Sequence, residues 1–353
     1  MARMRKVLAV GLAAAMALAA AGCSGPGSGK ETAAQTAEKT QESTEKKETE
    51  AEQTEAAGEK AQSGEKEDTG KKKVIAFVPK QLGNPYFVAI RDAMEEAAAE
   101  AGFEFKCNAP DASTEVDKQV SIAEAFVEAN VDALVLGPCD KTAIVDVINK
   151  ADSKGIPVFL VDSGADESNY VTYIGTDNFE GGKIAAKWFG ENVKGQVAIV
   201  DGAAGNDATT QRYKGFMEAI AEYPDVEVVT SDYANGDLSQ GMTVAENFLT
   251  AYPNLAGIFA VDDMMAIGAG QAVEAANKKE QVKVCGFDGQ PDAAQKVLEG
   301  TIDVTIAQKP ATMGRMVVDA IEKYMAGEDV ERVINTGCDV VTAENAKTYL
   351  EWQ

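Results

Sequence analysis

The sequence predicts an α/β protein made of two doubly wound lobes, each built on a parallel sheet. From Lys72 onward, short apolar runs alternate with amphipathic helical patterns. This alternation indicates parallel strands joined by right-handed helical crossovers. The strands are too many for one comfortable sheet, and the region of about 280 residues is long for one core, so we expect two lobes.

The first series of elements begins with an apolar run, Val74 to Val78, which indicates a buried strand. Gly83-Asn-Pro85 then marks a loop, and apolar residues at helical spacing follow from Phe87 onward. Gly102, Asn130 and Gly155-Ile-Pro157 supply the later breaks. The predicted elements are strand 73–78, helix 85–101, strand 103–107, helix 114–129, strand 132–136, helix 142–154 and strand 157–162.

A second series begins near Val171, and the boundary between the lobes is expected near Gly175-Thr-Asp177. Its predicted strands are 171–175, 196–201, 226–231, 256–260, 282–286 and 303–307. Its predicted helices are 179–193, 207–222, 238–251, 264–276, 291–299 and 310–326, followed by a short extended end.

Residues 1–23 have the pattern of a signal peptide, with a basic start followed by an apolar run too short to span a bilayer comfortably. Leu18-Ala-Ala-Ala-Gly-Cys23 resembles the bacterial lipoprotein cleavage box, which implies lipid attachment at Cys23. Ala20 departs from that box, which prefers Leu there. The alternative is an ordinary signal peptide cut near Ala21. Either way we expect an extracytoplasmic protein, and lipid chains would tether it to the cell membrane.

Residues 24–70 contain no aromatic and almost no branched aliphatic residue. Such a segment buries too little surface to offset its chain entropy, so we expect a disordered acidic linker. As a flexible coil it would span roughly 35–40 Å on average.

Composition excludes several functions. A net charge of −24 argues against nucleic-acid binding. The absence of His removes the commonest general base and transition-metal ligand, so we expect neither a metal nor a cofactor. Beyond Cys23, four cysteines remain at wide, irregular spacing: Cys107, Cys139, Cys285 and Cys338. They fit no zinc pattern, and their pairing cannot be assigned, although Cys139 and Cys285 beside strand ends favour buried free thiols.

Polar residues follow the predicted strands where parallel sheets bind ligands, at the carboxyl ends. They are Asp140, Asp162, Asp262, Asp263, Asp288 and Gln308. Tyr86 and Phe87 occupy the first helical turn after the first strand, with Asn84 and Lys80 before them. Flat aromatic faces beside polar groups suit a sugar. The alternatives are helix capping for the aspartates, core packing for the aromatics, and a structural salt bridge for Arg212, which lies within helix 207–222.

Seven stretches in order across residues 72–353 resemble the substrate-binding proteins of bacterial ABC sugar importers, in the ribose-binding branch of the type I periplasmic-binding fold. These stretches are Ile75-Ala-Phe-Val…Gly83-Asn-Pro-Tyr-Phe87, Gly155-Ile-Pro-Val-Phe-Leu-Val-Asp162, Ile174-Gly-Thr-Asp-Asn-Phe-Glu-Gly-Gly-Lys183, Arg212-Tyr-Lys-Gly-Phe216, Ile258-Phe-Ala-Val-Asp-Asp-Met-Met-Ala-Ile-Gly268, Gly286-Phe-Asp-Gly-Gln-Pro-Asp292 and Thr305-Ile-Ala-Gln-Lys-Pro310.

The resemblance implies which residues touch a monosaccharide or similar polyol. Asn84, Tyr86 and Phe87 would do so from the first lobe, with Asp162 near the hinge. The second lobe would contribute Phe287, Asp288, Gln308 and, where ribose binders use Asn, Asp262. Carboxylates accept charge-assisted hydrogen bonds from hydroxyls, and aromatic faces cover the apolar side of the ring.

Five positions depart from the ribose-binding pattern and argue against ribose itself: Lys80, Gly137, Ser163, Thr210 and Gly236. Lys80 replaces a small polar residue and is expected to pair with Asp140, Asp162 or a strongly polar ligand. Its alternative is a solvated loop lysine. Autoinducer-2 and rhamnose-type relatives carry a Lys in a comparable place, so those ligands stay open.

The resemblance also implies a three-strand hinge and discontinuous lobes, with the first comprising 72–176 and 309–337 and the second 177–308 and 338–353. A monomer of this kind closes on its ligand and delivers it to an ABC permease and its ATPase, without being an enzyme. One alternative is a receptor that presents its ligand to a chemotaxis or kinase sensor. Another is a sugar hydrolase that uses Asp162 and Asp288. A repressor is excluded, because residues 1–70 carry no helix-turn-helix.

Overall fold

The computed structural model describes residues 71–352. The predicted signal peptide 1–23, the linker 24–70 and Cys23 lie outside this range. Within it no helix is long and apolar enough to cross a membrane.

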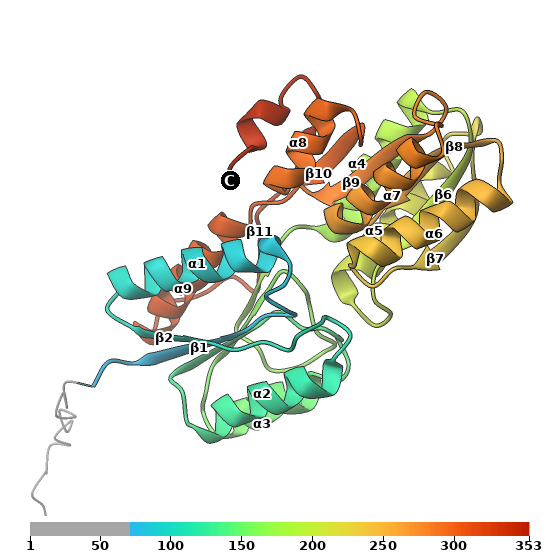
Figure 1. The fold of residues 1–353 in the computed structure, drawn as a ribbon. Helices are drawn as coiled ribbons and strands as arrows, with labels where there is room; N and C mark the ends of the chain where they lie inside the picture. Colours follow the sequence, from blue (N-terminus) through green and yellow to red (C-terminus); the bar gives the residue numbers. More distant parts are fainter. Residues whose placement is uncertain (1–70, 353) are drawn as a thin grey trace, which may run out of the picture. The chain divides into compact units, whose positions relative to one another are not determined.

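The first sheet has six strands, all parallel, in the order β11-β5-β4-β3-β1-β2 (Figure 1). Its strands are β1 (Val74–Val78), β2 (Glu104–Cys107), β3 (Ala133–Leu136), β4 (Val158–Val161), β5 (Thr172–Gly175) and β11 (Val333–Asn335). Its helices are α1 (Pro85–Glu100), α2 (Val116–Glu128), α3 (Val145–Ser153) and α9 (Pro310–Met325).

Helices cover both faces of this sheet, and β1 shows why. Ile75 and Phe77 belong to the apolar cluster formed with α1 and α9, which lie side by side. Val74, Ala76 and Val78 belong to the cluster formed with α2 and α3. Alternate side chains of a strand point to opposite faces, so a continuous apolar run fits a sheet that is buried on both sides.

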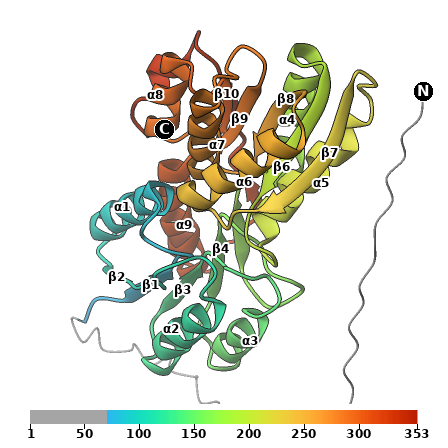
Figure 2. The same cartoon turned by 45° about the vertical axis from the view of Figure 1, so that its right-hand side comes forward.

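The second sheet repeats this plan in the order β12-β10-β9-β8-β6-β7 (Figure 2). Its strands are β6 (Gly195–Asp201), β7 (Val226–Tyr233), β8 (Leu255–Ala260), β9 (Lys283–Asp288), β10 (Val304–Ala307) and β12 (Asp339–Val341). Its helices are α4 (Asn178–Asn192), α5 (Asp207–Ile220), α6 (Leu238–Ala251), α7 (Asp263–Ala275) and α8 (Pro291–Glu299), with a short 3₁₀ helix η1 (Ala346–Tyr349). Helices α4 and α5 pack together, as do α6 and α7.

The chain passes between the sheets three times: between β5 and α4, between β10 and α9, and between β11 and β12. Two of these crossing segments are hydrogen-bonded to each other. Thr336 donates its backbone N–H to Gly175, and Asn335 accepts one from Asp177. These two crossing segments are therefore joined by hydrogen bonds and are not independent linkers.

The predicted fold class is confirmed, with small differences in detail. Helix α3 begins at Val145, because residues 140–144 form a turn capped by Asp140. The expected extended end contains two short strands, of which β12 pairs antiparallel with β10. All four cysteines in the described range are free, and Cys139 and Cys285 are buried as predicted.

Candidate functional site

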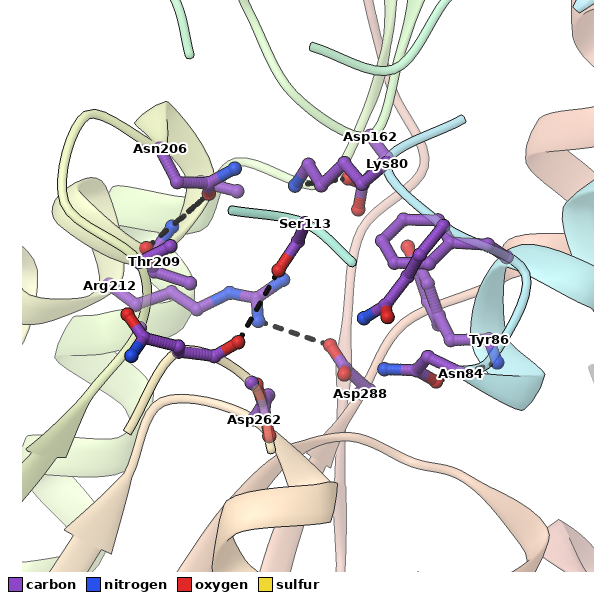
Figure 3. A pocket seen from close by; sticks show the side chains of 17 residues that line it. Lys80, Asn84, Tyr86, Ser113, Asp162, Asn206, Thr209, Arg212, Asp262 and Asp288 are labelled. Atoms are coloured by element: carbon purple, nitrogen blue, oxygen red, sulfur yellow. Dashed lines mark hydrogen bonds and ion pairs between the residues drawn. The ribbon is translucent and has the colours of Figure 1, made fainter. Parts of the chain in front are cut away.

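A cavity of about 50 Å³ lies where the carboxyl ends of strands from both sheets meet (Figure 3). The first lobe lines it with Lys80, Gln81, Asn84, Tyr86, Phe87, Ser113 and Asp162. The second lobe lines it with Gly202, Ala203, Asn206, Ala208, Thr209, Arg212, Asn235, Gly236, Asp262 and Asp288. This is the place where open α/β sheets bind ligands.

The start of α1 brings Asn84, Tyr86 and Phe87 to the cavity. Asn84 is the N-cap of this helix, and its Oδ1 accepts a hydrogen bond from the Tyr86 backbone N–H at 2.9 Å. Pro85 occupies the first helical position, where its missing N–H costs nothing. The rings of Tyr86 and Phe87 meet edge to face, with centroids 5.3 Å apart. Capping and ligand contact are compatible, because the Asn84 amide N–H groups remain free of the cap.

Lys80 and Asp162 form a buried ion pair on the first-lobe wall. Lys80 Nζ lies 2.8 Å from Asp162 Oδ2, and the two side chains are only 7% and 3% exposed. The ammonium group also lies 5.5 Å from the centre of the Phe87 ring. Of the three partners considered for Lys80, the structure shows Asp162. Lys80 is not a solvated loop lysine.

Asp288 and Arg212 form the corresponding pair in the second lobe. Asp288 Oδ1 accepts from Arg212 Nη1 at 3.1 Å and from Gln308 Nε2 at 2.8 Å. Arg212 also donates Nε–H to Asn178 and Nη1–H to the Val261 carbonyl, so its guanidinium is held on three sides. Both bonds to Asp288 end on Oδ1, which leaves Oδ2 for a ligand.

The two paired carboxylates occupy equivalent places in the two lobes. Asp162 follows β4 and Asp288 ends β9, and these strands stand third in their respective sheet orders. Both residues have positive φ, +67° at Asp162 and +126° at Asp288. Such backbone conformations are costly for residues other than glycine and cluster at ligand sites. Each lobe thus holds one strained, cation-paired carboxylate at its ligand-facing edge.

Asp262 adds a third carboxylate. Its Oδ1 caps α7 by accepting from the Met265 N–H at 2.9 Å. Burial raises the pKa of Asp262, and it raises the pKa of Asp288 well above its ordinary value, because both charges are removed from water. Arg212 opposes this change at both residues. Ligand hydroxyl groups that donate hydrogen bonds to Asp262 and Asp288 would also favour the ionised forms of these two carboxyl groups.

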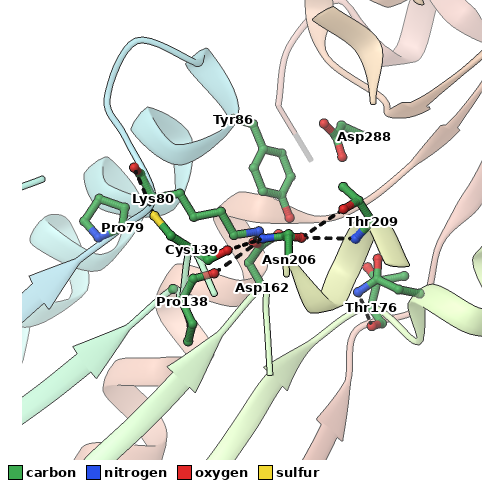
Figure 4. Close-up of polar contacts among 12 residues, drawn as sticks. Pro79, Lys80, Tyr86, Pro138, Cys139, Asp162, Thr176, Asn206, Thr209 and Asp288 are labelled. Atoms are coloured by element: carbon green, nitrogen blue, oxygen red, sulfur yellow. Dashed lines mark hydrogen bonds and ion pairs between the residues drawn. The ribbon is translucent and has the colours of Figure 1, made fainter. Parts of the chain in front are cut away.

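Direct hydrogen bonds join the two lobes at the rim of the cavity (Figure 4). Asn206 Nδ2 donates to the carbonyls of Pro138 and Cys139, each at 3.4 Å. The Lys141 N–H donates to the Gly205 carbonyl at 3.2 Å. On another part of the rim, Ser113 Oγ donates to the Asn235 carbonyl at 3.3 Å. The described conformation is therefore a closed one.

Three predicted site residues do not line the cavity. Asp140 caps the turn before α3, with Oδ1 accepting from the N–H groups of Thr142 and Ala143. Phe287 is fully buried, and its ring centre lies 3.9 Å from the Arg212 guanidinium carbon. Gln308 lies behind Asp288 and donates to it. For these three, direct ligand contact is corrected to a supporting or capping position.

Five polar lining residues were missed from the sequence: Gln81, Ser113, Asn206, Thr209 and Asn235. Asn206 had a usable signal, because it follows β6 and caps α5 as Asn84 follows β1 and caps α1. Its Oδ1 accepts from the Thr209 N–H at 3.1 Å. Ser113 and Asn235 lie in loops and had no such signal.

Comparisons with known proteins agree with this geometry. Residues 75–329 match the periplasmic binding protein domain family. The ribose import binding protein RbsB of Bacillus subtilis (strain 168) is 33% identical over 272 residues, covering 76% of this chain and 87% of the relative.

Two solved structures are similar as well. An ABC transporter periplasmic solute-binding protein from Actinobacillus succinogenes 130z, with bound D-allose, is 35% identical, with a TM-score of 0.75, covering 79% of this chain and 100% of that one. An ABC transporter solute-binding protein from Bacillus halodurans C-125, with bound myo-inositol, is 31% identical, with a TM-score of 0.72, covering 79% of this chain and 97% of that one. The chain therefore belongs to the periplasmic binding protein family, and it resembles the ribose-binding proteins of ABC importers.

Proposed function

We propose that this protein captures a neutral monosaccharide or similar polyol between its lobes and delivers it to an ABC permease. The observation that carries the proposal is the pair of strained strand-end carboxylates, Asp162 and Asp288, which face one cavity from different lobes. A ligand that bonds to both stabilises the closed conformation by contacts that the open one lacks.

The charges of the cavity favour a neutral ligand. Two cations, Lys80 and Arg212, are already paired with two carboxylates, and Asp262 adds a third carboxyl group. An anionic ligand would find neither of these cations free in a buried site. Hydroxyl groups can instead donate to the carboxylates and accept from Lys80, Asn84 and Arg212, and charge-assisted bonds of this kind are about twice as strong as neutral ones.

The same pairing argues against catalysis. A general acid must carry a proton to the leaving group, whereas each of these two carboxylates is already engaged by a buried cationic donor. Asp162 has Lys80 at 2.8 Å, and Asp288 has Arg212 at 3.1 Å. We therefore propose a binding protein that does no chemistry on its ligand. The signal-peptide pattern and Cys23 support a lipid-anchored location outside the cytoplasm.

A thermal-unfolding screen tests the proposal. D-ribose, D-allose and myo-inositol would be compared with D-gluconate, which keeps hydroxyl groups but adds a negative charge. A ligand at 100 times its Kd stabilises the folded protein by about 2.7 kcal/mol, which is easily measured. We expect stabilisation by at least one neutral polyol and none by gluconate. The proposal would be contradicted if no neutral polyol stabilised the protein against thermal unfolding, or if a bound polyol were turned over.

A further inference from the structure

The carboxylate of Asp263 is fully buried and holds the turn that carries Asp288. Asp263 Oδ2 accepts a hydrogen bond from the Gln290 backbone N–H at 2.7 Å. Its Oδ1 accepts from Thr305 Oγ1 at 2.6 Å, and that hydroxyl in turn accepts from the Gly289 N–H at 3.4 Å. The two residues that follow Asp288 are thus both bonded, directly or through Thr305, to Asp263.

This turn has to be held in place. Asp288 has φ +126° and the next residue, Gly289, has φ +71°. The conformation at Asp288 belongs to a region that residues with a side chain rarely occupy, and it persists only where surrounding bonds enforce it. Relaxation of this backbone would turn the carboxylate of Asp288 away from the cavity.

Helix capping does not explain why a carboxylate stands at position 263. The neighbouring Asp262 is the N-cap of α7 and satisfies the helix N–H at Met265. Burial raises the pKa of Asp263 to about 7, so an ionised carboxylate there is costly. Gly286 also makes room for it, because a Cβ at that position would overlap Asp263 Oδ1. A buried carboxyl group with space left for it and hydrogen bonds to a single turn indicates a role in that turn.

We propose that Asp263, through Gln290 and Thr305, is a positioning residue that fixes the backbone of Asp288 and so aims its carboxylate at the ligand. This inference rests on the proposed function, because it assigns Asp288 to polyol binding. Asp263 does not line the cavity, so it acts through another residue instead of touching the ligand.

The test uses Asp263→Asn and Thr305→Val, each of which removes part of the network. Asp303→Asn is the matched control, because Asp303 accepts from the Val284 N–H at 2.9 Å near the opposite end of the same strand, β9. Affinity is measured by calorimetry for each of D-ribose, D-allose and myo-inositol. We expect Asp263→Asn and Thr305→Val to weaken binding at least tenfold, and Asp303→Asn to change it less than twofold.

Coupling to Asp288 separates positioning from a general loss of stability. In an Asp288→Asn background, Asp263→Asn should weaken binding less than twofold further, because the carboxylate that it aims is already gone. Full additivity of the two changes, or unaltered affinity in both Asp263→Asn and Thr305→Val, would overturn the inference. Thr305→Val decides the matter if Asp263→Asn does not fold.

Hydrogen exchange gives a readout that needs no ligand. Asp263→Asn should speed amide exchange at Gly289 and Gln290, whereas Asp303→Asn should leave it unchanged. Unchanged exchange at both amides in Asp263→Asn overturns the inference whether or not a polyol binds. If the unaltered protein binds none of the three polyols, the proposed function fails, and exchange still decides whether Asp263 holds the turn.

Discussion

The indole ring of Trp352 lies edge to face with the phenol ring of Tyr86, with ring centroids 6.2 Å apart. Tyr86 lines the cavity from α1 in the first lobe, and Trp352 packs with the apolar cluster of that lobe. The chain reaches Trp352 from β12 in the second sheet and from η1, which packs against α8. The C-terminal segment therefore connects the second lobe to a wall of the binding cavity.

This contact makes Trp352 an internal reporter of closure. The chain has two tryptophans, Trp188 and Trp352, so Trp188→Phe leaves Trp352 as the sole source of indole emission. We expect the emission of this variant to change when a bound polyol closes the lobes, because the segment that carries Trp352 is attached to the second lobe whereas its ring packs on Tyr86 of the first. Trp352→Phe is the control, since Trp188 packs on Phe189 within the second lobe and should respond little. Equal responses from both variants would contradict the assignment.

Gly205→Ala should hinder closure. Gly205 has φ +84°, and a Cβ there would overlap Asp140 Oδ2 across the rim. We expect affinity to fall at least tenfold, which corresponds to about 1.4 kcal/mol. Gly300→Ala is a matched control in the same lobe, with φ +81° and no atom near the added Cβ.

Asp140→Ala in the Gly205→Ala background separates the clash from backbone strain. Removal of the Asp140 carboxylate should restore part of the lost affinity, because the added methyl group then has space. Calorimetry on the single and double variants measures this. An equal loss in Gly205→Ala and Gly300→Ala would show that strain, and not the rim contact, is responsible.

Lys80→Met should destabilise the protein as well as weaken binding. It leaves Asp162 buried without its cation, and breaking a buried pair typically costs about 3–5 kcal/mol. Adding Asp162→Asn removes the stranded charge, so the double variant should recover most of the stability but not the affinity. Urea unfolding and calorimetry give the two quantities. A single variant as stable as the unaltered protein would show that the ion pair contributes little.

Stability should depend on pH through Asp201, which ends β6. Burial raises the pKa of Asp201 from 3.8 to about 6, partly offset by the hydrogen bond from the Gly202 N–H. The folded state then binds the proton more tightly than the unfolded state. The stability this gives is present below pH 3.8 and is lost as pH rises toward about 6.

Asp201→Asn should remove this pH dependence, because Asn keeps an acceptor for Gly202 but does not titrate. The difference in free energy of unfolding between the unaltered protein and Asp201→Asn should fall from pH 4 to pH 6. Urea unfolding at several pH values measures it. Parallel pH profiles for the two proteins would contradict the prediction.

The sequence predicted the features that depend on local pattern. The apolar run of β1 and the helical spacing after Pro85 established the first strand and helix, and Asp162 and Asp288 followed from their places at strand ends. The same reasoning failed for Phe287, which precedes Asp288 on the same strand. Neighbouring strand residues point to opposite faces, so the ring that was expected at the ligand instead packs beside Arg212 and Gly181.

The missed residues depend on contacts between distant segments. Ser113 meets Asn235 only because the two lobes are closed, and no local pattern in either loop indicates this. The sequence left three candidate partners open for Lys80, because the distance from its ammonium group to each of them depends on how the chain folds. Asp140 was placed correctly at a strand end, but its carboxylate was already used by the turn that follows.

The three crossings of the chain also set the order in which the protein can be completed. β1 is made first, but its sheet lacks β11 until residues 333–335 have been added, and α1 lacks α9 until residues 310–325 have been added. Until then the apolar side of α1, including Ile90 and Met94, has nothing to pack against from α9. The second sheet lacks only its edge strand β12 at that point, because the strands from β6 to β10 form an uninterrupted stretch. The lobe that starts the described chain is therefore the one that remains unfinished longest during synthesis, and a chain cut short at residue 309 would expose its core.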